Sequence, residues 1–289
     1  MIKTVALLCL VATASAFVRF DLTLFGIGTS AFIELPQSGV KAVAAGWVQK
    51  ERPSAPEGYA GLVMWCPKDD YTVCVLIDDT DYIAGLQVAL NIEQFSHNVY
   101  DWTAQGFTYW TTEMDGTVKN YWTTQQYYVS TEYLQRDPAA RVAARDPNLL
   151  LQDDAIYVSG FNGVPYKIST NVSDIIEDGS DFKKQACIPW MGQHYYYKMD
   201  ESLGCDAGSM FPWFPLIDSN QLIGVGLLTF GKHSVPEGNR DWFETPARSA
   251  VETIVPRGPQ CLYDQVDTAG VVTMHTYFIK RPYGVTCIF

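Results

Sequence analysis

The sequence predicts an all-β, mainly antiparallel protein made of two packed β-sandwich-like domains and one short connecting helix. Three observations support this class. Runs of alternating or β-branched residues recur along the chain, and turn-forming residues separate them at intervals of roughly ten residues. Only one segment carries clear helix signals. The 289 residues, 47% of them hydrophobic, supply enough material for about two domains.

Strand signals dominate the chain. The predicted strands are residues 20–24, 71–77, 82–90, 107–114, 117–129, 155–161, 164–168 and 271–279. Asp115-Gly116 and Asn162-Gly163 each separate two of these runs. Such dipeptides favour tight hairpin turns, because Asn, Asp and Gly tolerate positive φ angles. Each dipeptide therefore predicts an antiparallel pair of strands.

The helix is predicted just before the middle of the chain. Asp137 can cap its start, Pro138 suits the first helical position, and residues 139–145 favour helix. Asp146-Pro147 should end it. We expect this helix to connect the two domains. The predicted division is a signal peptide at 1–16, an N-terminal β domain at 17–135, a connector at 136–150 and a C-terminal β domain at 151–289.

A weak internal repeat suggests that the two domains arose by duplication. Leu76-Ile77-Asp78 recurs as Leu216-Ile217-Asp218, and Asp101-Trp102 recurs as Asp241-Trp242, with the same spacing. Residues 126–129 also resemble residues 276–279. The alternative is chance matching of common strand patterns. If the repeat is real, a ligand site between the two copies is a natural location.

The first sixteen residues have the pattern of a secretory signal peptide. Lys3 precedes a short apolar run, and Ala14-Ser15-Ala16 forms an A-x-A cleavage motif. No later stretch is long and apolar enough to predict a transmembrane helix. The expected location is therefore extracellular. Asn171-Val172-Ser173 is a sequon for glycosylation of Asn171.

Six cysteines follow the predicted signal peptide, and an even number in an oxidising compartment predicts three disulfides. We expect the pairs Cys66–Cys74, Cys187–Cys205 and Cys261–Cys287, which close short loops within each proposed domain. Cys66–Cys205 is the main rival pairing, because the repeat places these two cysteines at matching positions.

The negative net charge of the chain limits the classes of partner that it is expected to bind. The formal net charge is −12, from 20 basic and 32 acidic residues. Nucleic acids and anionic membranes recruit basic surfaces, so neither is expected as a partner. The sequence does not predict an oligomeric state.

No catalytic motif is present, so no catalytic residue, cofactor or catalytic metal is expected. One alternative is a secreted hydrolase or a metalloenzyme. On strands, His194 would share a face with Tyr196, and His275 would lie opposite Met274. Two such separated histidines could assemble a copper or zinc site with Met199 or Met274 as a further ligand. Ordinary buried or surface histidines explain the same residues.

Aromatic and acidic residues suggest recognition instead. Tyr and Trp combine an apolar face with a polar tip, which suits glycan stacking or protein contacts. The predicted function is a secreted, non-catalytic protein that binds a glycan or an extracellular protein. A carrier of a small apolar ligand is a second alternative. The predicted ligand-binding residues are Trp102, Trp242, Asp101, Asp241, Asp78, Asp79 and Asp81.

Overall fold

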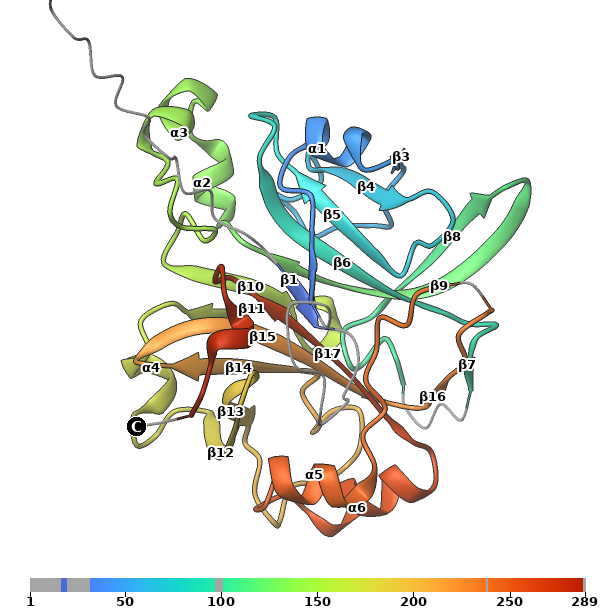
Figure 1. Ribbon diagram of the computed structural model, residues 1–289, viewed down its shortest axis with the longest axis vertical. Coiled ribbons are helices and arrows are strands. Elements are labelled where there is room, and N and C mark those ends of the chain that lie inside the picture. Colours follow the sequence, from blue (N-terminus) through green and yellow to red (C-terminus); the bar gives the residue numbers. More distant parts are fainter. Residues whose placement is uncertain (1–16, 20–31, 97–100, 238, 288–289) are drawn as a thin grey trace, which may run out of the picture.

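The computed structural model describes residues 17–19, 32–96, 101–237 and 239–287, with backbone only for 17–19. Its strands are almost all in two large antiparallel sheets, which confirms the predicted fold class (Figure 1). The predicted signal peptide, the predicted strand at 20–24 and His97 lie outside the described residues.

The first sheet contains the strands of the N-terminal half and the hairpin that follows it. Its order is β11 (Pro165–Ser169), β10 (Ala155–Ser159), β9 (Thr117–Tyr127), β6 (Ile83–Asn91), β5 (Val73–Ile77), β4 (Val63–Pro67) and β3 (Trp47–Lys50), with β8 (Thr108–Met114) also paired to β9. The β8–β9 turn is Asp115-Gly116, and both residues have positive φ, 48° and 74°. The hairpin predicted from this dipeptide is therefore confirmed.

The second sheet contains strands from both ends of the chain. Its order is β12 (Phe182–Ile188), β13 (Gly192–Tyr197), β14 (Trp213–Asp218), β15 (Gln221–Phe230), β17 (Val271–Tyr277), β1 (Phe17–Arg19) and β2 (Phe32–Glu34). A small third sheet pairs β7 (Phe95–Ser96) with β16 (Lys232–His233). The sheets do not follow the predicted domain boundaries, since β1 and β2 pair beside β17 while β10 and β11 pair beside β9.

Helices cover the edges and outer faces of the sheets. They are α1 (Gly39–Ala44), α2 (Thr131–Gln135), α3 (Pro138–Ala144), α4 (Ser173–Ile176), α5 (Arg248–Ile254) and α6 (Gln260–Asp267), with short 3₁₀ turns at Phe161–Gly163 and Pro282–Gly284. The predicted helix is α3, and the Asp137 side chain accepts a hydrogen bond from Ala140 N as expected of a cap. The sequence did not predict α5 and α6, which have no side-chain cap hydrogen bond.

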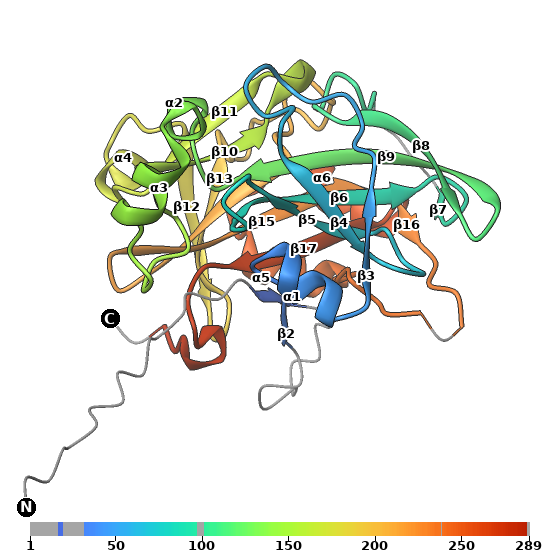
Figure 2. The same cartoon turned by 90° about the horizontal axis from the view of Figure 1, so that it is seen from above.

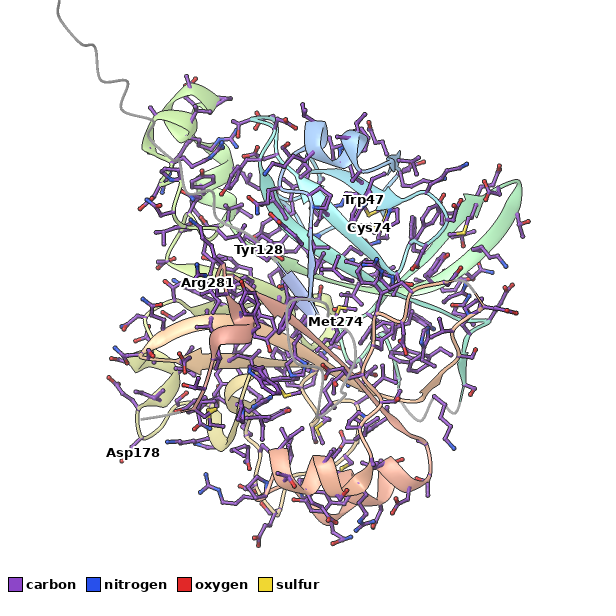
Figure 3. The ribbon with its side chains drawn as sticks, in the orientation of Figure 1. Trp47, Cys74, Tyr128, Asp178, Met274 and Arg281 are labelled. Atoms are coloured by element: carbon purple, nitrogen blue, oxygen red, sulfur yellow. A yellow bond between two sulfur atoms is a disulfide. The ribbon has the colours of Figure 1, made fainter. Side chains whose placement is uncertain are left out.

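Three apolar clusters hold these layers together. The first lies between the two sheets and includes Val75, Leu86, Val225 and Met274. A second packs the outer face of the second sheet against α5 and α6 (Figure 1), and the third covers the outer face of the first sheet. Strand alternation assigns side chains to these clusters, because successive residues point to opposite faces. Figure 3 shows Met274 near the centre of the molecule.

The repeated sequence segments occupy matching places in the two sheets. Leu76 pairs with Gly85, Leu216 pairs with Gly224, and a register shift follows each leucine. Gln126 Nε2 donates to Thr276 Oγ1 at 3.0 Å, so two residues matched in the repeat also meet between the sheets. This correspondence does not demonstrate duplication, which stays a prediction, as does the division into domains.

Candidate functional site

A groove of about 730 Å³ opens where four separate segments meet. It is lined by residues 33–36 at the end of β2, by Lys41 of α1 and residues 45–47 at the start of β3, by the β4–β5 turn at 67–70, and by residues 239, 240 and 242. Two of its lining residues are tryptophans, Trp47 and Trp242. This volume is within the range of pockets that hold small ligands.

Trp242 is fixed on one wall by a polar contact. Its Nε1 donates a hydrogen bond to Asp70 Oδ2, and the other oxygen of Asp70 accepts from Thr72 N at 3.0 Å. The Arg240 guanidinium lies over the indole, 5.2 Å from the ring centroid. Only 4% of Trp242 is exposed. Asp70 therefore positions Trp242, and the indole is held rigidly.

Trp47 begins β3 at the other side of the groove, directly after α1. The Ser38 side chain caps α1 by accepting from Lys41 N, and Asp81 Oδ1 accepts from Gly39 N at 2.6 Å. Gly46 then takes a φ of 77°, a left-handed conformation that suits glycine and turns the chain into β3. Trp47 remains half-buried. Figure 3 shows where it lies in the fold. Local turn chemistry thus presents this indole at the groove.

Charged side chains surround the two tryptophans. Lys41 and Lys68 are exposed, and within the described part of the chain neither side chain forms an ion pair or hydrogen bond. Glu34 and Asp69 are exposed carboxylates of the same lining. Among the described lining residues there is no histidine, cysteine, serine or threonine. The groove therefore offers an aromatic face, ammonium groups and exposed carboxylates.

The predicted acidic residues Asp78, Asp79 and Asp81 have other roles in this structure. Asp78 Oδ2 accepts from Arg141 Nη1 at 2.7 Å, and its Oδ1 accepts from Thr80 N at 2.8 Å. Asp79 also pairs with Arg141. Asp81 accepts from Gly39 N. These three carboxylates hold the β5–β6 turn to α1 and α3. The ligand-binding role that the sequence suggests for them stays a prediction.

The other predicted contact residues are divided between core and surface. Trp102 is 5% exposed and packs against Phe107, with ring centroids 4.7 Å apart. Asp101 and Asp241 are exposed, and each caps a local turn by accepting from a backbone N–H, of Ala104 and Phe243 respectively. Of the predicted ligand-binding residues, only Trp242 lines the groove.

Sequence reasoning missed Trp47, Lys41 and Lys68. The available signal was the turn at Ala45-Gly46 directly before an aromatic strand residue. That signal is local, whereas the groove depends on residues 239–242 lying opposite, so the sequence offered no reason to group these side chains.

The structure brings together two histidines that are 81 residues apart in the sequence. The Nε2 atoms of His194 and His275 lie 3.4 Å apart, and His275 Nδ1 lies 3.0 Å from Glu244 Oε2. Met274 points to the opposite face, into the cluster between the sheets, so it is not a third ligand. Among the described residues, no three His, Cys, Asp or Glu side chains are grouped to hold a metal ion.

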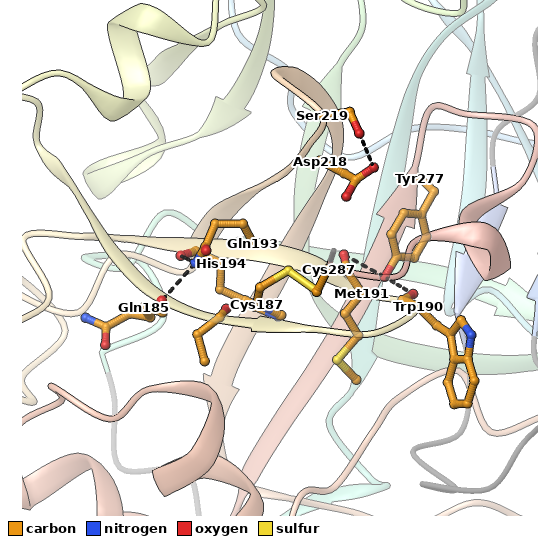
Figure 4. The surroundings of a disulfide bond; sticks show 11 residues. Gln185, Cys187, Trp190, Met191, Gln193, His194, Asp218, Ser219, Tyr277 and Cys287 are labelled. Atoms are coloured by element: carbon orange, nitrogen blue, oxygen red, sulfur yellow. Dashed lines mark hydrogen bonds between the residues drawn. A yellow bond between two sulfur atoms is a disulfide. The ribbon is translucent and has the colours of Figure 1, made fainter. Parts of the chain in front are cut away.

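The disulfides correct two of the three predicted pairs. Cys66–Cys74 is confirmed, but the other pairs are Cys205–Cys261 and Cys187–Cys287, the last of which is drawn in Figure 4. Short loop length was the wrong criterion for these pairs. Packing brings the C-terminal segment beside β12, and it brings α6 beside the loop after β13, so the partners are 100 and 56 residues apart. The rival pair Cys66–Cys205 is excluded by the same connections.

The sequon residue Asn171 is exposed, in a turn before α4. Within the described ranges, no helix is both long and apolar enough to cross a bilayer. No model of a protein family, no curated protein and no solved structure gives a significant match to this chain. The function is therefore inferred from the geometry and chemistry of the sites.

Proposed function

We propose that this protein is a secreted, non-catalytic recognition protein that binds a glycan in the groove between Trp47 and Trp242. The groove carries this proposal. Its volume of about 730 Å³ suits a short oligosaccharide. A protein partner of standard size needs a much broader surface, about 800 Å² on each side.

The chemistry of the lining supports a sugar. The half-buried Trp47 indole offers a flat apolar face on which the C–H face of a sugar ring can stack. Trp242, only 4% exposed and covered by Arg240, forms a rigid wall opposite it. Trp242 is held by Asp70, so little side-chain freedom is lost when a ligand binds. The ammonium groups of Lys41 and Lys68 favour a glycan that carries a carboxylate or a sulfate. We therefore expect acidic glycans to bind more tightly than neutral ones.

Secretion is the second part of the proposal. The leader pattern at 1–16 and the pairing of all six later cysteines support an oxidising, extracellular destination. Glycosylation at the exposed Asn171 belongs to the same proposal.

Binding of the purified protein to an array of neutral, sialylated, sulfated and uronate-containing glycans tests the proposal. Titration calorimetry on the best ligand then measures affinity. Trp47→Ala should cost at least about 2 kcal/mol, the cost typical of a hot-spot aromatic. Trp47→Phe should fold normally and bind with intermediate affinity. Lys68→Gln, at an exposed position, should weaken acidic ligands selectively.

Tyr109→Ala is the matched control, because Tyr109 is a 50% exposed aromatic on β8 that does not line the groove. It should leave the affinity unchanged. The proposal is wrong if no glycan class binds, or if Trp47→Phe and Lys68→Gln both bind like the original protein.

A further inference from the structure

A second groove, of about 550 Å³, lies beside α1 and shares no lining residue with the groove of Trp47 and Trp242. Two of its apolar residues come from α1, and the others come from β4 and β5 at the edge of the first sheet. These apolar lining residues are Val40, Val43, Val63, Trp65 and Ile77. Helix α1 packs beside β3 and β4 (Figure 1). The volume is within the range of pockets that hold small ligands.

The apolar wall of this second groove is open to water. Val40 is 72% exposed, the highest value among the large apolar side chains of the described residues, and Val43 is 60% exposed. The two valines are three positions apart on α1, so they lie on one side of the helix. Trp65 is half-buried next to them in the lining. A ligand with an apolar body would remove this surface from water, which favours binding.

The charged side chains of the second groove are all acidic. Asp78, Asp79 and Asp81 of the β5–β6 turn line it, and no lysine, arginine or histidine is among its described lining residues. Asp78 and Asp79 share the guanidinium of Arg141. Asp81 is exposed, and within the described part of the chain its carboxylate forms no ion pair. The groove therefore complements a cation, and Asp81 is the carboxylate that can receive it.

The Asp81 carboxylate and the Trp65 indole lie close together at the start of α1. A Cβ added to Gly39 would lie 2.9 Å from Asp81 Oδ1 and 3.4 Å from Trp65 Nε1, so the two side chains meet around this glycine. Asp81 Oδ1 accepts from Gly39 N at 2.6 Å, which fixes the carboxylate in place. Arg145 does not occupy this position, because its guanidinium lies over the Tyr82 ring, 4.0 Å from the centroid. A ligand whose cation binds Asp81 therefore has its neighbouring apolar part beside Trp65.

We propose that the second groove binds a small apolar amine, a ligand with an ammonium group on a hydrocarbon body. The ammonium pairs with the Asp81 carboxylate, and the body contacts Val40, Val43 and Trp65. Because an ion pair at an exposed carboxylate contributes little free energy, apolar contact supplies most of the affinity and Asp81 supplies the preference for a cation. The two grooves share no lining residue, so this proposal does not rest on the glycan proposal.

Titration of the full chain with hexylamine, hexan-1-ol and hexanoate at neutral pH tests the proposal, because these probes share one hydrocarbon body and differ in charge. The readout is the indole N–H signal of Trp65 in the nitrogen-15 magnetic resonance spectrum, identified by its absence from Trp65→Phe. We expect hexylamine to shift this signal and to bind about fivefold more tightly than hexan-1-ol, the gain typical of an exposed ion pair. Hexanoate should bind most weakly.

Two variants separate the charge from the apolar surface. Asp81→Asn keeps an oxygen for Gly39 N and tolerates the φ of 54° at this position, so it should fold and bind hexylamine and hexan-1-ol equally. Val43→Gln, at an exposed position, should weaken both probes by the same factor. Asp115→Asn is the matched control, since Asp115 is an exposed aspartate with a φ of 48° outside the groove, and it should change nothing.

Three results would overturn the proposal. They are an unchanged Trp65 signal with hexylamine, equal binding of hexylamine and hexan-1-ol by the original protein, and a preference for the amine that persists in Asp81→Asn. The original protein decides the first two even if a variant fails to fold. Trp47→Phe, in the other groove, should leave hexylamine binding unchanged, so failure of the glycan proposal is distinguishable from failure of this one.

Discussion

Replacing Arg141 by Met should be among the most destabilising single changes in this protein. Arg141 is 2% exposed, and its Nη1 donates to Asp78 Oδ2 at 2.7 Å. Asp78 is 6% exposed. Removing the guanidinium leaves the Asp78 carboxylate buried without its counter-charge, and α3 loses its main polar attachment to the β5–β6 turn.

The expected cost follows from the burial of each contact. Removing one partner of a buried ion pair typically costs about 3–5 kcal/mol, because the remaining charge is uncompensated. The contact with Asp79 adds at most about 1 kcal/mol, since the Asp79 side chain is 61% exposed and water screens the pair. We therefore expect Arg141→Met to lower the free energy of unfolding by about 4 kcal/mol.

Urea unfolding followed by tryptophan fluorescence measures this free energy. The double variant Asp78→Leu with Arg141→Met should be more stable than the sum of the single changes predicts, because it leaves no unpaired charge. Lys119→Met removes an exposed pair with Glu93 and is the control, with an expected cost below about 1 kcal/mol. A cost of less than about 1 kcal/mol for Arg141→Met would refute the reasoning.

Three further predictions concern packing, cross-links and pH. Gly226→Ala should lower the free energy of urea unfolding by about 1–3 kcal/mol, because a Cβ there would lie 2.0 Å from the buried Phe214 ring. Gly61→Ala should be neutral, because a Cβ at that position would have no atom within 4 Å. Equal effects of the two substitutions would contradict this prediction. Replacing both Cys187 and Cys287 by Ser should lower the free energy of unfolding by about 5 kcal/mol, and replacing both Cys66 and Cys74 by about 2.5 kcal/mol. The difference arises because the entropy of loop closure grows with the sequence separation, which is 100 residues for the first pair and 8 for the second. The reverse order of costs would show that loop entropy does not dominate. Burial raises the pKa of Tyr128 and Tyr196 above the usual 10. The folded state should therefore keep its stability below pH 10 and lose it as the pH rises further. Tyr128→Phe should reduce this alkaline loss of stability, and an ultraviolet titration in which all tyrosines of the folded protein ionise normally would contradict the prediction.

Much of the local structure could be predicted from the sequence, because its signals act over a few residues. Asp115-Gly116 adopts the positive φ angles that a tight hairpin needs, and Asp137 caps α3 as its side chain allows. Successive side chains of β17 point to two different buried faces, and this alternation predicted that Met274 and His275 lie on opposite sides of the sheet. The even number of cysteines likewise predicted three disulfides.

Only the tertiary structure decided which distant segments meet. Periodicity shows that a residue is buried, but it does not show against what, and several pairings of strands satisfy the same pattern. Trp102 and Trp242 have the same sequence context, yet one packs beside Phe107 and the other lines a groove. Cys187 and Cys287 meet across 100 residues, and His194 and His275 across 81. These contacts depend on the packing of whole layers, and no local signal in the chain specifies that packing.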